Sequence, residues 1–241
     1  MSKPYSDMKR WLESQDGRRV EKMLTLAAEL SVDAIVSHSR AKEEGTDYAR
    51  RQYVRSVFAM IEGTIYVMKL LAKRPDIERF SAAELSLLSE ESYDLNDMGK
   101  PIIRPHYLKL EKNIKFSFSM YAKSCDVSYI LPVQEPGWNA LKQSIKVRNR
   151  LMHPKNPGDL DVTNDELNNV EIADEWFNQK YRELQYVIIV QWLREKGFSS
   201  EAIMDLYERS VFRPFSESFK SRDEFERYRE SRMSEIKKVL Q

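Results

Sequence analysis

A short segment, residues 148–154 with the sequence RNRLMHP, combines two arginines, an asparagine and a histidine. Imidazole side chains have a reference pKa of about 6.5, so a histidine can take up and release protons near neutral pH. Arginine stays charged and can hold a phosphate through two parallel hydrogen bonds while negative charge builds on it. These residue types are therefore suited to acid–base chemistry beside a phosphate group.

The segment closes a helix that we predict from about residue 137 to His153. Pro154 disfavours helical geometry at His153 and cannot continue the helix itself, so the helix should end there. Asn149 and His153 lie about 40° apart around such a helix, whereas Arg148 and His153 lie about 140° apart. A straight helix therefore presents Asn149 together with His153. Arg148 reaches the histidine only if the last turn bends or a second copy of the chain supplies the partner.

Helical periodicity runs through nearly the whole chain, and the alternating runs typical of strands are scarce. Residues 94–101 are predicted to form a loop, followed by a small extended excursion through 102–104. Capping signals at Thr46, Ser81 and Thr163 set several helix boundaries. The predicted helices span residues 16–39, 48–73, 81–92, 105–124, 137–153, 163–176 with a break, 174–196, 200–210 and 221–240.

Two of these helices carry the clearest signals of a buried core. Residues 174–196 are apolar on most faces, so we predict a central, largely buried helix that includes Trp176 and Trp192. The helix that begins at residue 48 has a regular apolar stripe, formed by Val54, Val57, Phe58, Ile61, Ile65, Met68 and Leu71. The expected fold class is all-α. Residues 1–197 would form a helical bundle, and residues 198–241 a C-terminal helical extension packed on the same domain.

The composition excludes several classes of protein. The 39 Lys and Arg residues nearly balance the 38 Asp and Glu residues, so any RNA-binding surface must be local. One cysteine and three histidines exclude a Cys/His zinc cluster and an intramolecular disulfide, and we expect no metal and no cofactor. No apolar run approaches the roughly 18 residues of a membrane span, and the N-terminus has no apolar signal region. We therefore expect a cytoplasmic protein that does not bind membranes.

Residues 148–154 resemble the Arg-x4-6-His motif of HEPN-domain proteins, in whose common form an asparagine follows the arginine. The order of elements from about Arg18 to Lys196 is also similar, with two long early helices, a variable middle, the motif near the end of a later helix, and another long helix. Glu62, in the second helix, resembles the acidic residue that many members place near the motif. The resemblance implies an antiparallel helical bundle with additional C-terminal helices.

The same resemblance implies a homodimer with the two motifs facing each other across a two-fold axis, so that both copies line one cleft. It also implies metal-independent RNA cleavage by attack of the ribose 2′-OH, leaving a 2′,3′-cyclic phosphate, in a toxin or defence role. Arg148 would bind phosphate and His153 would act as acid and base, with Asn149 and Glu62 in support. RNA and a regulatory protein such as an antitoxin are the implied partners.

The basic residues close to the motif and at the start of the second helix are candidates for contacts with RNA. We expect RNA-binding roles for Arg150, Arg51, Arg55 and Lys155, provided that the two clusters converge on one cleft. Whether the two clusters converge depends on how the helices pack.

Simpler interpretations remain open at this level. His153 could only complement the helix dipole, and Arg148 could only form an interhelical ion pair with Glu62. The chain would then be a non-catalytic helical module that binds a nucleotide or a protein partner. The acidic side chains between residues 159 and 175 are interpreted as a solvated helix face, and His38 and His106 as surface or capping residues.

Overall fold

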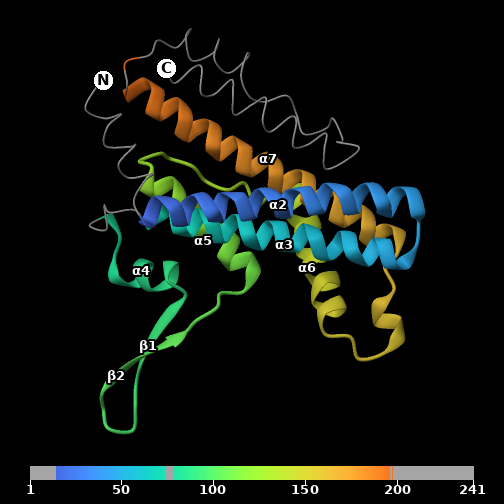
Figure 1. The fold of residues 1–241 in the computed structure, drawn as a ribbon, viewed down its shortest axis with the longest axis horizontal. Helices are drawn as coiled ribbons and strands as arrows, with labels where there is room; N and C mark the ends of the chain where they lie inside the picture. Colours follow the sequence, from blue (N-terminus) through green and yellow to red (C-terminus); the bar gives the residue numbers. More distant parts are fainter. Residues whose placement is uncertain (1–14, 74–78, 196, 198–241) are drawn as a thin grey trace.

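The computed structural model describes residues 15–73, 79–195 and 197, and this part of the chain is predominantly helical (Figure 1). The predicted all-α fold class is confirmed. The helices predicted after Gly197, and the predicted C-terminal extension, lie outside the described residues. The elements are α2 (Gln15–Glu44), α3 (Asp47–Ala72), α4 (Ala82–Leu88), β1 (Glu91–Leu95), β2 (Pro101–Pro105), α5 (Leu110–Ser124), α6 (Pro136–Met152), the 3-10 helix η2 (Pro157–Leu160) and α7 (Asn164–Glu195).

Helices α2 and α3 form a long antiparallel pair (Figure 1). The turn between them contains Gly45, which has a positive φ of 61°. The Thr46 side chain accepts a hydrogen bond from the Ala49 N–H at 3.2 Å and so caps α3, as predicted. Helix α2 continues past Ser39, its predicted end, to Glu44. Its true end lies just before Gly45, because no residue between Ser39 and Gly45 breaks the helix.

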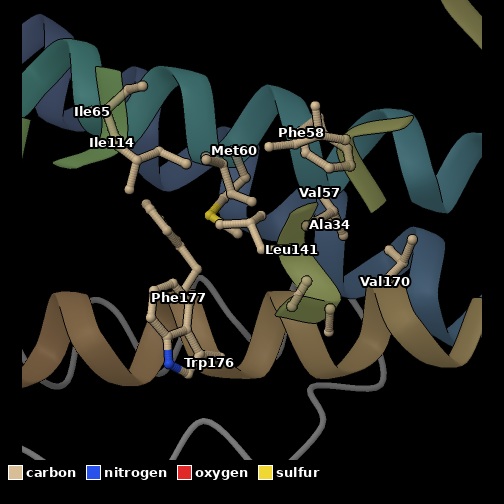
Figure 2. Packing of buried hydrophobic residues seen from close by; sticks show 14 of the residues in the cluster. Ala34, Val57, Phe58, Met60, Ile65, Ile114, Leu141, Val170, Trp176 and Phe177 are labelled. Carbon is tan, nitrogen blue, oxygen red and sulfur yellow. The ribbon is translucent and has the colours of Figure 1, made fainter. Parts of the chain in front are cut away.

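The apolar stripe of α3 forms much of the core, as predicted. Helix α3 packs against α2, α5, α6 and α7. Figure 2 shows Met60 of α3, Leu141 of α6 and Phe177 of α7 gathered between the helices. The ring of Phe177 meets Phe118 of α5 edge to face, with centroids 5.9 Å apart. The core is therefore continuous across these four helices.

Close packing of α6 on α7 depends on Gly137. A Cβ atom at this position would lie 2.2 Å from Cγ of Trp176, so a larger residue would displace the tryptophan. The Trp176 Nε1–H donates a hydrogen bond to Oε2 of Glu135 at 2.6 Å. Pro136 begins α6 directly after that glutamate, at the position where a helix needs no N–H donor. The first turn of α6 is thus matched to one tryptophan of α7.

Helix α7 is one continuous helix, so the break predicted near Trp176 does not occur. Its buried side chains end at Leu184, and Ile189 and Trp192 are exposed. The prediction of a largely buried helix at 174–196 is therefore wrong for its second half within the described residues. In Figure 1 this half diverges from the α2–α3 pair. An apolar composition indicates that a helix needs a partner but not where that partner lies.

Strands β1 and β2 form an antiparallel hairpin that projects from the helices (Figure 1). Tyr93 pairs with Ile103 in its register. The connecting loop is held by the Asn96 side chain, whose Oδ1 accepts hydrogen bonds from the N–H groups of Met98 and Lys100 at 3.0 and 2.9 Å. The predicted extended excursion is thus half of a hairpin.

The hairpin also corrects two predicted helix boundaries. Helix α4 ends at Leu88 rather than near residue 92, although its predicted capping box at Ser81 is present. Helix α5 begins at Leu110 rather than at Pro105, which lies at the end of β2. Helical periodicity carries no information about strand pairing. The prediction from periodicity therefore extended both helices into residues that belong to the hairpin. Within the described residues, no helix is long and apolar enough to cross a membrane.

Candidate functional site

The predicted motif lies at the C-terminal end of α6. The helix ends at Met152, and His153 follows with φ −134° and ψ 57°, outside the helical region that Pro154 disfavours. The His153 N–H still donates to the carbonyl of Asn149 at 3.2 Å. Both side chains are exposed. Across the described part of the chain, the His153 imidazole has no hydrogen bond or ion pair with another side chain, so it is accessible to a substrate.

Arg148 forms the interhelical ion pair that the sequence suggested. Its Nη2 donates to Oε1 of Glu62 on α3 at 2.5 Å, and its Nη1 donates to Oδ1 of Asn149 at 3.1 Å. The arginine side chain is 26% exposed. Glu62 and Asn149 therefore hold the guanidinium in one orientation, while its remaining N–H groups stay available as donors.

Three further arginines donate hydrogen bonds to carbonyl groups of the loop that follows His153. Arg50 Nη1 donates to Val162 O and Arg51 Nη1 to Leu160 O, each at 3.1 Å. Arg150 Nη2 donates to Oε1 of Glu166 at 2.7 Å. Arg150 Nη1 also faces three carbonyls, those of Gly158 at 3.4 Å, Asp159 at 3.1 Å and Asp161 at 2.8 Å. The two basic clusters do converge, but on the protein backbone.

These contacts bear on the residues predicted to bind RNA. Arg150 and Arg51 have their Nη1 atoms committed to the loop. Arg55 lies half-buried on α3, seven positions before Glu62, and Lys155 is exposed in the loop. Of these four, Lys155 has the most open side chain. The role of Arg50, Arg51 and Arg150 in holding this loop was not predicted from the sequence. The basic clusters themselves are the sequence signal that could have suggested it.

The loop is also organised by its own side chains. Asn156 and Asp159 form a capping box around η2. The Lys155 N–H donates to Oδ2 of Asp159 at 2.7 Å, and this hydrogen bond is the main reason that the pKa of Asp159 lies below its usual value. Thr163 and Glu166 form the predicted capping box at the start of α7. His153 is therefore held between a helix end and an ordered loop.

A hollow of about 730 Å³ lies beside the motif, and Arg148 and Asn149 form part of its lining. It is bounded by α3, by the first turn of α5, by α6 and by the base of the hairpin. Lys69, which is almost fully buried, pairs with Glu90 in its wall. The other lining residues are Glu62, Ile65, Tyr66, Tyr107, Leu108, Lys109, Leu110, Glu111, Asn113 and Ile145.

A second polar cluster lies between α2, α3 and α7. The Tyr53 hydroxyl donates to Oδ2 of Asp174 at 3.1 Å, and Asn178 Nδ2 donates to Oδ1 of Asp174 at 2.7 Å. Burial raises the pKa of Asp174 to about 6, and burial together with Asp174 raises the pKa of Tyr53. His38 stacks near Tyr53, with centroids 4.7 Å apart, and bonds Glu171 at 3.2 Å.

This cluster corrects the interpretation of the acidic residues between 159 and 175. Asp174 lies on the buried face of α7, four residues after Val170 and three before Phe177. That spacing is the signal that could have identified it. His38 lies within α2 rather than at its end, because that helix is longer than predicted. Within the described residues, no group of three His, Cys, Asp or Glu side chains gathers in a way that could hold a metal ion.

No family model matches the chain, and no match was found among curated proteins or solved structures. A function must therefore be inferred from the site itself.

Proposed function

We propose that this protein is a metal-independent endoribonuclease of the HEPN type that acts as a homodimer, in a toxin or defence role. The observation that carries the proposal is the geometry at the end of α6. Arg148 is oriented by Glu62 and Asn149, and an accessible His153 ends the same helix. The proposal therefore assigns phosphate binding and proton transfer to one short segment that is anchored on both sides.

In this mechanism His153 takes the proton from a ribose 2′-OH, and the freed oxygen attacks the adjacent phosphorus. The bond from phosphorus to the 5′-oxygen breaks, and that oxygen receives the proton back from the same histidine. The products are a 2′,3′-cyclic phosphate and a 5′-hydroxyl end. Arg148 stabilises the negative charge that builds on the phosphate oxygens during the attack.

The orientation of the two side chains around α6 supports the proposed homodimer. With about 100° between successive residues, Arg148 and His153 point to different sides of the helix. A phosphate held by Arg148 of one copy would then be reached by the histidine of the other. The 26% exposure of the Arg148 side chain leaves it accessible for such a contact.

The proposal is tested by incubating the purified protein with a mixed RNA pool in EDTA and reading the product ends. We expect fragments with 2′,3′-cyclic phosphate from the parent, and a loss of at least about 100-fold for His153→Ala and for Arg148→Ala. Lys146→Ala, an exposed basic residue on the same helix, is the matched control and should cleave like the parent. Equal cleavage by all four proteins, or none by the parent, would contradict the proposal.

One observation favours a second candidate, a non-catalytic module that binds a protein partner such as an antitoxin. The projecting hairpin exposes Tyr93, Leu95 and Ile103 on one face, with exposed fractions of 66%, 61% and 61%. Exposed apolar side chains grouped in this way are typical of interaction surfaces. In that case His153→Ala would leave the function of the protein unchanged, whereas charged substitutions on the hairpin would abolish it.

A further inference from the structure

The hollow beside Arg148 has the dimensions and position of a ligand site. Its volume of about 730 Å³ lies within the range of roughly 300–1,000 Å³ that small-molecule sites occupy. Arg148 and Asn149 belong to both the motif and the lining of the hollow. Any nucleotide whose phosphate contacts Arg148 would therefore have this space directly beside it.

The charges in the lining balance. Arg148 pairs with Glu62, and the buried Lys69 pairs with Glu90. The remaining charged residues of the lining, Lys109 and Glu111, are one cation and one anion. The lining has no excess of positive charge to bind a second phosphate, because Arg148 and Lys69 already have carboxylate partners. The hollow is better suited to an uncharged polar group than to another anion.

Two tyrosines offer surfaces for a flat ring. Tyr66 lies on α3 and is 38% exposed, and Tyr107, just after the hairpin, is 75% exposed. Bases of single-stranded RNA stack on aromatic side chains with little dependence on sequence. Ile65 and Leu108 add apolar surface to the same lining. Aromatic and apolar surface inside a polar, charge-balanced hollow matches the chemistry of a nucleobase.

Asn113 lacks a partner for part of its amide. Its Oδ1 is buried and has no hydrogen bond, one of three such side-chain atoms in the described part of the chain. The residue lies in the first turns of α5 and lines the hollow. The terminal torsion of an asparagine is soft, so the amide can turn toward a ligand. An amide offers a donor and an acceptor together, and the edge of a base such as adenine complements both.

We propose that this hollow binds the nucleobase next to the phosphate held by Arg148, with Tyr66 and Tyr107 stacking on the base and Asn113 bonding its edge. The proposal rests on the proposed function for the identity of the ligand. It assigns to this chain a base-binding subsite that would set where RNA is cut. Its test can fail separately from the test for cleavage.

The experiment measures binding of AMP, GMP, CMP and UMP to the full-length protein by calorimetry, with ribose 5-phosphate as the base-free probe. We expect at least one nucleotide to bind about tenfold more tightly than ribose 5-phosphate, because stacking on an aromatic side chain contributes that much. Tyr107→Ala and Asn113→Ala should each weaken this binding several-fold. Tyr48→Ala, an exposed tyrosine at the other end of α3, is the matched control and should change nothing.

The outcomes separate the two proposals. Equal binding of nucleotides and ribose 5-phosphate, or equal affinities for Tyr107→Ala, Asn113→Ala and the control, would overturn the base-binding subsite even if the protein cleaves RNA. Base-dependent binding that is lost in both variants would support the subsite even if no cleavage is seen. Because Tyr107 is largely exposed, its substitution tests the subsite without the risk of unfolding that attends Asn113.

Discussion

At the scale of single residues, the environment of each ionisable group decides its role. Arg148 is oriented by one carboxylate and one amide, whereas His153 is left accessible at a helix end. Burial also acts on Asp174, whose carboxyl is bonded to Tyr53 and Asn178 between three helices. Burial disfavours the charged carboxylate and therefore raises its pKa to about 6.

The pKa of Asp174 predicts how stability depends on pH. Its folded pKa of about 6 exceeds the ordinary value of 3.8, so the folded state binds the proton more tightly than the unfolded chain does. The resulting stabilisation is present below about pH 4 and is lost as pH rises through 6. The loss amounts to about 3 kcal/mol. Urea unfolding of the parent and of Asp174→Asn between pH 4 and pH 7 should show this difference between them.

The comparison of the two proteins removes the contribution of other groups. Glu84, Glu135 and Asp159 have lowered pKa values and act in the opposite direction in both proteins. His38, Glu171 and Glu175 lie near Asp174 and also remain in both. Parallel stability curves for the parent and the variant across this range would show that Asp174 is not the group responsible.

At the scale of elements, the loop after α6 depends on side chains from α3, α6 and α7. Arg50, Arg51 and Arg150 bond its carbonyl groups, and Glu166 anchors Arg150 from the first turn of α7. This arrangement explains how a polar, turn-rich segment can hold one conformation next to the histidine. It also makes Arg150 a residue that positions His153 through the loop.

Arg150→Ala is therefore expected to lower the free energy of unfolding by about 1–2 kcal/mol, because charge-assisted hydrogen bonds are lost while water partly replaces them. If the protein cleaves RNA, kcat should fall and KM should change little. Arg150→Lys should not restore either quantity, since an ammonium group cannot bond several carbonyls in a fixed plane. Urea unfolding and steady-state cleavage rates measure both effects.

The alternative role of Arg150, direct contact with RNA, gives a different result. Its removal would then leave the unfolding free energy unchanged and would reduce the salt dependence of RNA binding by about one phosphate contact. Lys146→Ala is again the matched control, because that side chain is exposed and, among the residues that the structure describes, bonds only Gln143 of the same helix. A stability loss confined to Arg150→Ala would identify the loop as the contact that matters.

At the scale of the whole molecule, the site is incomplete in one copy if Arg148 and His153 must act together. Their positions differ by about 140° around the axis of a regular helix, and α6 continues as an α-helix to Met152. A two-fold dimer would place the arginine of each copy near the histidine of the other. The assembly, rather than the fold of one chain, would then create the active site.

Mixing two inactive variants tests this arrangement. Arg148→Ala and His153→Ala proteins, unfolded together and refolded, should regain about a quarter of the parent activity. Half of the dimers would be mixed, and one of the two composite sites in each would keep both residues. Each variant refolded alone should stay inactive. Absence of recovery, with dimers present by light scattering, would show that each site is built within one copy.

Features that depend only on neighbouring residues could be predicted from the amino-acid sequence. Helix ends at Thr46, Ser81 and Pro154 were predictable because capping and proline geometry act within one turn. The buried stripe of α3 followed from its periodicity, and the all-α class from the scarcity of strand patterns. The ion pair of Arg148 with Glu62 was foreseen as one of two interpretations.

Features that depend on contacts between separate segments became known from the packed fold alone. The hairpin register, the partners of Arg150 and the exposure of Trp192 follow from which segments meet in the fold. The same arginine is suited to an RNA phosphate or to backbone carbonyls, and its charge alone does not choose between them. That choice is made by which acceptors the packed helices bring within hydrogen-bond distance.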